Sequence, residues 1–128
     1  MTTVLVIDDD PSVLRFLVDS LEFVRYEVYA ALDGKQGVQL AQQHLPQAIV
    51  CDIMMPQMDG YEFTSTLRAQ AAYQHLPVVM LTSRSGEKHR QKAFEVGATE
   101  YLVKPYQDDV LLSTIRRLVP QAEGVSAA

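Results

Sequence analysis

The sequence lacks most of what a disulfide-linked or membrane-bound protein needs. Its 128 residues include a single cysteine, Cys51, so no disulfide can form within the chain. No apolar run approaches the roughly 20 residues that a membrane-spanning helix requires. The first ten residues, MTTVLVIDDD, have neither the basic nor the long apolar region of a signal peptide. These absences favour a protein of the reducing cytoplasm without membrane contacts.

Positive charge is also scarce. The chain has 11 Lys and Arg against 16 Asp and Glu, which gives a net charge of −5. Surfaces that bind nucleic-acid phosphates need the opposite balance, so we expect no direct nucleic-acid partner. The remaining composition, 48% hydrophobic and 21% charged, is that of one compact domain. We place this domain at residues 1–119 and expect residues 120–128 to form a flexible tail or the start of a linker.

Short apolar runs alternate with longer segments of helical period. The runs are Val4–Ile7, Val28–Ala31, Ala48–Val50, Val78–Leu81 and Tyr101–Val103. Several of them are apolar throughout, which is typical of strands in a parallel sheet that is buried on both faces. Helices must then cover both faces of that sheet.

Start and stop signals predict five helices after these runs. The first helix begins at Asp10-Pro11, and the third follows Asp59-Gly60. The second, fourth and fifth helices span about 34–44, 87–96 and 108–118. In the second helix, Val38, Ala41 and Leu45 are expected to face inward. Five strands that alternate with five helices indicate an α/β fold, a (βα)5 doubly wound domain with right-handed crossovers.

Polar residues follow the strands where such folds bind ligands, at the carboxyl ends of the strands. They are Asp8-Asp9-Asp10, Asp52, Thr82-Ser83 and Lys104-Pro105. Because parallel strands end at one edge of the sheet, we expect these side chains to converge.

Three carboxylates, from Asp8, Asp9 and Asp52, would repel one another if they met without a cation. Hard oxygen ligands with few other donors nearby favour Mg²⁺, which typically binds one or two carboxylates, keeps waters and adds a substrate phosphate. With the ammonium group of Lys104 nearby, the cluster fits a phosphoryl-transfer site. Asp52 would be its nucleophile and would form an acyl phosphate.

Each of these residues alone has a simpler interpretation. Asp10 fits the N-cap of the first helix better than it fits a metal ligand. Asp52 alone could be a solvated strand end, Thr82 and Ser83 could form a turn, and Lys104 could be a surface charge. The combination favours a site, because four separate strand ends each supply a residue type that one reaction needs.

Four segments together resemble the receiver domain of response regulators, the switches of two-component signalling. They are VLVIDDDPSV, VCDIMMPQMDGYEF, PVVMLTSRS and GATEYLVKPY, in the family's order and spacing. With the helices between them they cover about residues 1–119. The resemblance, which extends to chemotaxis receivers, implies a flavodoxin-like fold with a five-stranded parallel sheet in the order 2-1-3-4-5.

By this resemblance, Asp52 accepts a phosphoryl group from a phosphohistidine of a sensor kinase or phosphotransfer protein, or from a small acyl phosphate. The ligands of Mg²⁺ would be Asp8, Asp9, Asp52 and the backbone carbonyl of Met54. Of the acidic pair, Asp9 would be the more direct ligand and Asp8 would act partly through water. Lys104 would contact the phosphoryl oxygens, and the peptide bond between Lys104 and Pro105 is cis in the family.

The resemblance also implies a conformational switch. The hydroxyl of Thr82 moves to the new phosphoryl group, and Tyr101 turns inward to fill the space. The surface of the fourth helix, fifth strand and fifth helix then changes, which alters binding of a downstream protein or a fused output domain. The fourth helix suits this movement because it has little apolar surface beyond Ala93, Phe94 and Val96. Such a domain is not a metabolic enzyme and catalyses only its own phosphorylation and slow dephosphorylation.

Three other functions compete with this interpretation. A haloacid-dehalogenase-type phosphatase has an Asp-x-Asp-x-Thr pattern after its first strand, whereas this chain has DDDPS and no room for a cap domain. A flavodoxin-like cofactor binder needs a phosphate-binding loop where this chain has three carboxylates. A receiver that only docks, and is never phosphorylated, does not need the complete set of Asp8, Asp9, Asp52, Thr82 and Lys104. The chain is either a stand-alone receiver or one domain of a longer protein.

Overall fold

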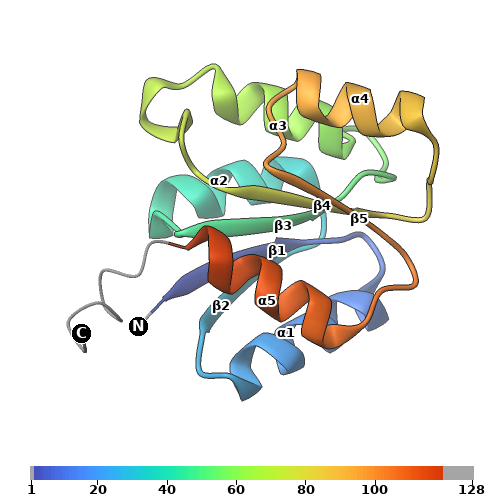
Figure 1. The fold of residues 1–128 in the computed structure, drawn as a ribbon. Helices are drawn as coiled ribbons and strands as arrows, with labels where there is room; N and C mark the ends of the chain where they lie inside the picture. Colours follow the sequence, from blue (N-terminus) through green and yellow to red (C-terminus); the bar gives the residue numbers. More distant parts are fainter. Residues whose placement is uncertain (1, 120–128) are drawn as a thin grey trace.

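Strands and helices alternate along residues 2–119, the part of the chain that the computed structural model describes (Figure 1). In chain order they are β1 (Thr3–Ile7), α1 (Pro11–Phe23), β2 (Glu27–Ala31), α2 (Gly34–His44), β3 (Ala48–Asp52), α3 (Gly60–Arg68), the short 3₁₀ helix η1 (Ala71–Tyr73), β4 (Val78–Thr82), α4 (Glu87–Glu95), β5 (Glu100–Val103) and α5 (Asp108–Leu118). The expected tail at 120–128 lies outside the described residues.

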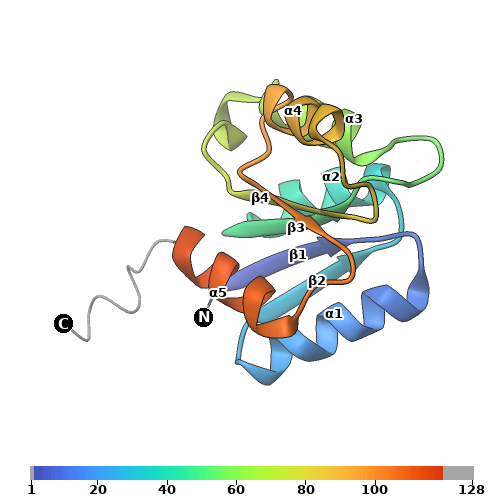
Figure 2. The same ribbon diagram turned by 45° about the vertical axis from the view of Figure 1, so that its right-hand side comes forward.

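The five strands form one parallel sheet in the order β2-β1-β3-β4-β5, which confirms the fold predicted from the sequence. Figures 1 and 2 show α1 and α5 on one face of this sheet and α2, α3 and α4 on the other. The chain therefore reverses its winding direction between β1 and β3. At such a switch point the connecting loops diverge, which leaves room for a ligand beyond the strand ends.

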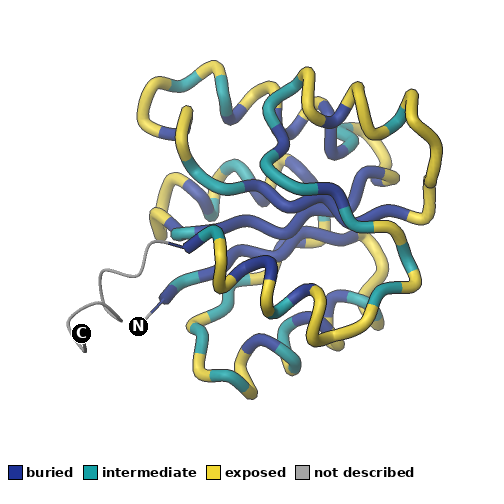
Figure 3. Tube along the Cα trace, in the orientation of Figure 1, coloured by how far each residue is buried: buried dark blue, intermediate teal, exposed yellow. Residues whose placement is uncertain are grey.

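Both faces of the sheet are buried, so its strands carry apolar residues at successive positions (Figure 3). In β1, Val4 and Val6 pack with α1 and α5, whereas Leu5 and Ile7 pack with α2 and α3. Successive side chains of a strand point to opposite faces, so a strand covered on both sides has no polar face. This explains why the strand sequences are apolar without alternation.

The helix boundaries follow from the capping residues. The side chain of Asp10 accepts hydrogen bonds from the backbone N–H groups of Ser12 and Val13, and Pro11 occupies the first helical position of α1. Asp10 is thus the N-cap that the sequence predicts. Gly97, just after α4, has a φ of 108°, the left-handed conformation expected for a glycine at a helix C-terminus.

The inward orientation predicted for Leu45 is wrong. Helix α2 ends at His44, and Leu45 adopts a left-handed conformation with a φ of 48°. Its side chain is 67% exposed. The helical period stops applying where the backbone leaves the helix, so the side chain turns away from the core. Val38 and Ala41, which lie within the helix, do pack on the sheet as expected.

Helix α4 is only lightly attached to the sheet. Ala93 is its one buried residue, and Phe94 is 39% exposed. This agrees with the small apolar surface that the sequence predicts for this helix. Within residues 2–119, no helix combines the length and apolar character needed to cross a bilayer.

Candidate functional site

Four strands bring the candidate site residues to one edge of the sheet. Asp52 and Thr82 are the last residues of β3 and β4, while Asp8 directly follows β1 and Lys104 directly follows β5. One oxygen from each of Asp8, Asp9 and Asp52 lies within 4.8 Å of the others. This is the only cluster of three or more potential metal-binding side chains found in the described part of the chain.

Asp8 is held in place by the main chain around it. Its backbone N–H donates to the carbonyl of Ala31, which extends the pairing of β1 with β2 by one residue. One carboxylate oxygen accepts a hydrogen bond of 2.9 Å from the backbone N–H of Asp10. Asp8 is 1% exposed, whereas Asp9 faces solvent. The pair therefore offers one fixed buried carboxylate and one accessible carboxylate.

Asp52 carries a buried charge. Burial, followed by the neighbouring charge of Asp8, raises the pKa of the Asp52 carboxyl. The ammonium of Lys104 and the backbone N–H groups of Ile53 and Met54 act in the opposite direction and lower this pKa. Removing water from Asp52 is the larger effect, so its ionised form is destabilised and would gain from a cation.

Lys104 supplies one such cation. Its Nζ lies 3.3 Å from Oδ2 of Asp8 and 3.5 Å from Oδ1 of Asp52, so the ammonium bridges two strand ends. The peptide bond between Lys104 and Pro105 is cis, as the resemblance implies. One ammonium against three carboxylates leaves excess negative charge at this edge.

The donor set fits Mg²⁺. Three carboxylates converge without any histidine or cysteine among them, and one of the three faces solvent. Mg²⁺ prefers oxygen ligands and keeps part of its water shell, so it suits a cluster that is open on one side. Met54 is 49% exposed. Its backbone carbonyl is the only part of Met54 that the resemblance assigns to the metal.

The two predicted switch residues meet at one residue of the β4–α4 loop. The hydroxyl oxygen of Thr82 accepts a 3.0 Å hydrogen bond from the backbone N–H of Arg84. The hydroxyl of Tyr101 donates a 2.6 Å hydrogen bond to the backbone carbonyl of the same Arg84. Tyr101 is 5% exposed, so its ring already lies inside in this structure. The sequence did not predict that Arg84 links both hydroxyls, because the hydrogen bonds involve its backbone.

Gly60 is a site residue that sequence reasoning missed. A β-carbon at this position would lie 2.6 Å from the backbone oxygen of Asp52 and 2.8 Å from Cα of Ile53. The N–H of Gly60 also donates to the carbonyl of Ile53. Helix α3 thus starts in direct contact with the end of β3. The signal in the sequence was the Asp59-Gly60 pair, which was used only as a helix start; Asp59 does cap α3 through the N–H of Glu62.

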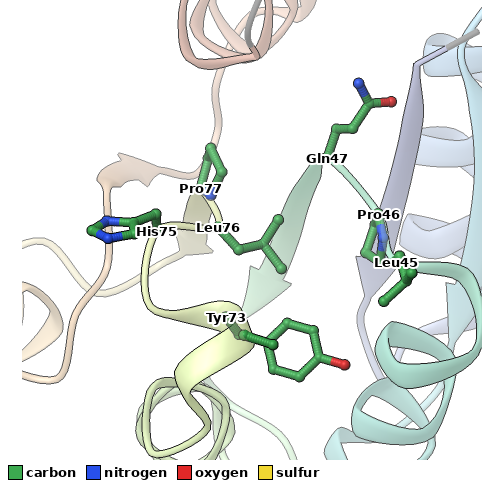
Figure 4. Close-up of a pocket in the computed structure, with 8 residues that line it drawn as sticks. Leu45, Pro46, Gln47, Tyr73, His75, Leu76 and Pro77 are labelled. Carbon is green, nitrogen blue, oxygen red and sulfur yellow. The ribbon is translucent and has the colours of Figure 1, made fainter.

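A hollow of about 260 Å³ lies at the opposite edge of the sheet (Figure 4). It is formed by the segments that precede β3 and β4, and its lining includes Leu45, Tyr73 and Leu76. None of the candidate site residues contributes to it, so it is separate from the carboxylate cluster.

Comparisons with known proteins agree with this geometry. A sequence profile described as "Response regulator receiver domain" matches residues 4–116. The response regulator Rre1 of Synechocystis is 38% identical over 130 residues, which cover 98% of this chain and 55% of that protein. The DNA-binding dual master transcriptional regulator RpaA of the same organism is 34% identical, with 100% of this chain and 53% of that protein covered. The chain spans about half the length of these relatives.

Solved structures share the fold over nearly the whole chain. The chemotaxis protein CheY4 of Vibrio cholerae superposes with a TM-score of 0.89 at 36% identity and covers 93% of this chain and 99% of its own. The BeF3-activated DrrB receiver domain has a TM-score of 0.81 at 28% identity, with 92% of this chain and 97% of its own covered.

Proposed function

The chain belongs to the response regulator receiver domain family, and from this premise we propose that it is a signalling switch that accepts a phosphoryl group on Asp52. The observation that carries the proposal is the meeting of Asp8, Asp9 and Asp52 within 4.8 Å, beside the ammonium of Lys104. The excess negative charge of such a cluster attracts a divalent cation, and that cation together with Lys104 can neutralise the charge of a transferring phosphoryl group. We assign the domain to residues 1–119.

In the proposed reaction, an oxygen of Asp52 bonds to phosphorus while the phosphorus–nitrogen bond of a phosphohistidine breaks and the imidazole keeps the electron pair. Bound Mg²⁺ would neutralise charge on the transferring oxygens. Asp8, Asp9, Asp52 and the carbonyl of Met54 are its proposed ligands. The N–H groups of Ile53 and Met54 orient the Asp52 carboxylate for attack.

We propose that Lys104 binds different groups before and after phosphorylation. It now bridges Asp8 and Asp52 at 3.3 and 3.5 Å. An ammonium on a flexible stem can follow the charge to a phosphoryl oxygen as that group arrives on Asp52. The domain therefore catalyses its own phosphorylation and slow hydrolysis of the acyl phosphate, and acts as a regulator of other proteins.

The signal leaves the site through Thr82. Its buried hydroxyl turns to donate to the phosphoryl group and no longer accepts from the N–H of Arg84. The loop that carries Arg84 leads directly into α4, which has only Ala93 buried. Weakly packed elements move at low cost. We therefore propose that the surface of α4, β5 and α5 changes and alters binding of a partner.

The proposed partners are proteins. A sensor kinase or phosphotransfer protein would supply the phosphoryl group, and a downstream protein or a fused output domain would respond. RpaA is DNA-binding by name, but the net charge of −5 supports protein rather than nucleic-acid contacts for this chain itself. A cytoplasmic location fits, because phosphohistidine donors draw on ATP inside the cell.

The test is covalent labelling. Wild type and Asp52→Asn are incubated with acetyl phosphate and Mg²⁺, and intact mass is measured. We expect one added phosphoryl group on wild type and none on Asp52→Asn. Wild type should also remain unlabelled when EDTA is present from the start of the incubation. Asp109→Asn, an exposed substitution of the same kind on α5, should label like wild type. Equal labelling of Asp52→Asn would remove Asp52 from the proposed role.

A further inference from the structure

A cationic hollow lies beside the phosphorylation site. It measures about 500 Å³ and lies between the β3–α3 loop, α3 and α4. Arg84, Lys88 and Lys92 line it together with His89, and Asp59 is its one acidic residue. None of the ion pairs found within residues 2–119 involves Arg84, Lys88 or Lys92. In a chain with a net charge of −5, this is a local excess of unpaired positive charge.

One of these cations, Lys92, is held by a contact between α4 and α3. The ammonium of Lys92 lies 4.6 Å from the centre of the Tyr61 ring, a cation–π contact that joins α4 to α3. The hydroxyl of Tyr61 donates to the carbonyl of His89 at 3.3 Å, one turn earlier in α4. Tyr61, itself buried, thus fixes the face of α4 that presents Lys88 and Lys92. The two views in Figures 1 and 2 both show α3 and α4 side by side.

The spacing of these positive charges indicates what kind of ligand the hollow could bind. Residues four apart on a helix are separated by about 6 Å along its axis, so Lys88 and Lys92 form a row on one face, and Arg84 precedes that row in the chain. All three side chains are exposed, and no buried polar group closes around a single small anion. A row of exposed cations fits several carboxylates at similar intervals, as on one face of an acidic helix.

We propose that this hollow is a docking site for an acidic helical segment of a partner protein, and that the switch controls its affinity through Arg84. The second part rests on the proposed function. Thr82 and Tyr101 both hold the backbone of Arg84, at 3.0 and 2.6 Å. When the hydroxyl of Thr82 leaves for a phosphoryl group, Arg84 loses one of these hydrogen bonds. Arg84, the cation that precedes the row, then shifts relative to Lys88 and Lys92.

The test uses a fluorescein-labelled alanine-rich peptide of about 18 residues, long enough for an isolated helix, with glutamate at every fourth position. Fluorescence anisotropy gives its dissociation constant, with and without beryllofluoride and Mg²⁺. We expect binding that weakens with salt, and none with glutamine in place of glutamate. The double variant Lys88→Gln/Lys92→Gln should bind about tenfold more weakly, as expected when two exposed ion pairs are lost. Its labelling by acetyl phosphate should equal that of wild type.

The matched control is Arg15→Gln/Lys35→Gln, which removes the same net charge from exposed positions of α1 and α2. Its affinity should stay within about twofold of wild type. An equal loss in this control, no binding in either state, or equally good competition by free glutamate would overturn the docking site. Identical affinity with and without beryllofluoride would overturn the proposal that the switch regulates peptide binding through Arg84. Failure of labelling with intact peptide binding would instead count against the proposed function alone.

Discussion

Replacing Asp52 by Asn should stabilise the protein in the absence of Mg²⁺. At an effective dielectric constant of about 20, unit charges no more than 4.8 Å apart repel by at least about 3.5 kcal/mol. Opposite charges 3.5 Å apart attract by about 4.7 kcal/mol. The attraction of Lys104 for Asp52 therefore roughly offsets the repulsion by Asp8. Burial of Asp52 and the screened charge of Asp9 remain as costs. We expect Asp52→Asn to raise the free energy of unfolding by about 1 to 2 kcal/mol.

The effect has a defined dependence on pH. The pKa of Asp52 is raised above its ordinary value of 3.8 in the folded protein, chiefly by burial. The folded state thus holds this proton more tightly than the unfolded state, and ionisation of Asp52 lowers stability. The advantage of Asp52→Asn should be absent below pH 3.8, grow as the pH rises through the folded-state pKa, and stay constant above it.

Urea unfolding followed by circular dichroism at pH 7.5, in EDTA, measures the difference. Asp109→Asn is the control, because Asp109 is exposed in the first turn of α5 and its loss should cost a few tenths of a kcal/mol. If Asp52→Asn were no more stable than wild type at pH 7.5, or if its advantage increased toward low pH, the account of a crowded buried carboxylate would be refuted.

The remaining predictions concern the metal and the supports of the site. At a hundredfold excess of Mg²⁺ over its Kd, wild type should gain about 2.7 kcal/mol of stability, and Asp52→Asn clearly less in the same urea titration; equal gains would place the metal elsewhere. Lys104→Met should bind Mg²⁺ more tightly by calorimetry, because one cation no longer competes for the carboxylates, while its labelling by acetyl phosphate slows; weaker Mg²⁺ binding would contradict the shared site. Gly60→Ala should lose about 1 to 3 kcal/mol, because the new methyl group meets the backbone of β3. Gly34→Ala meets the side chain of Met58, which can shift more readily than backbone, and should lose less; equal effects would refute the close approach. Arg68→Met should lose about 2 to 4 kcal/mol in chemical unfolding, because the carbonyls of Gly97 and Tyr73 both lose their donor; a loss under about 0.5 kcal/mol would show that water replaces these hydrogen bonds.

The sequence predicted the layers of the fold because burial on both faces leaves a direct trace in composition. Val4–Ile7 could be recognised as a two-sided strand since each of its residues packs on one helix layer or the other. The acidic cluster could also be predicted from the sequence, because parallel strands end at the same edge of the sheet and Asp8 and Asp52 lie at those ends. In both cases the order of residues along a strand is enough to predict where their side chains lie in the fold.

Features that depend on backbone geometry were not predictable in this way. Leu45 fits the helical period, yet the chain leaves the helix at His44 and the side chain becomes exposed. The link of Arg84 to both switch hydroxyls uses its N–H and carbonyl groups, which every residue type possesses. The contact of Gly60 with β3 depends on how the loop after Asp52 folds back onto the end of that strand, and the spacing of residues does not predict this path.

The most direct test of the central claim is a crystal structure of the protein with Mg²⁺ and beryllofluoride. The account predicts one Mg²⁺ bound by oxygens of Asp9 and Asp52 and the carbonyl of Met54, with Asp8 bound partly through a water. Beryllofluoride should be on Asp52, with Nζ of Lys104 on a fluoride. A magnesium ion bound away from Asp52, or beryllofluoride attached to another residue, would contradict it.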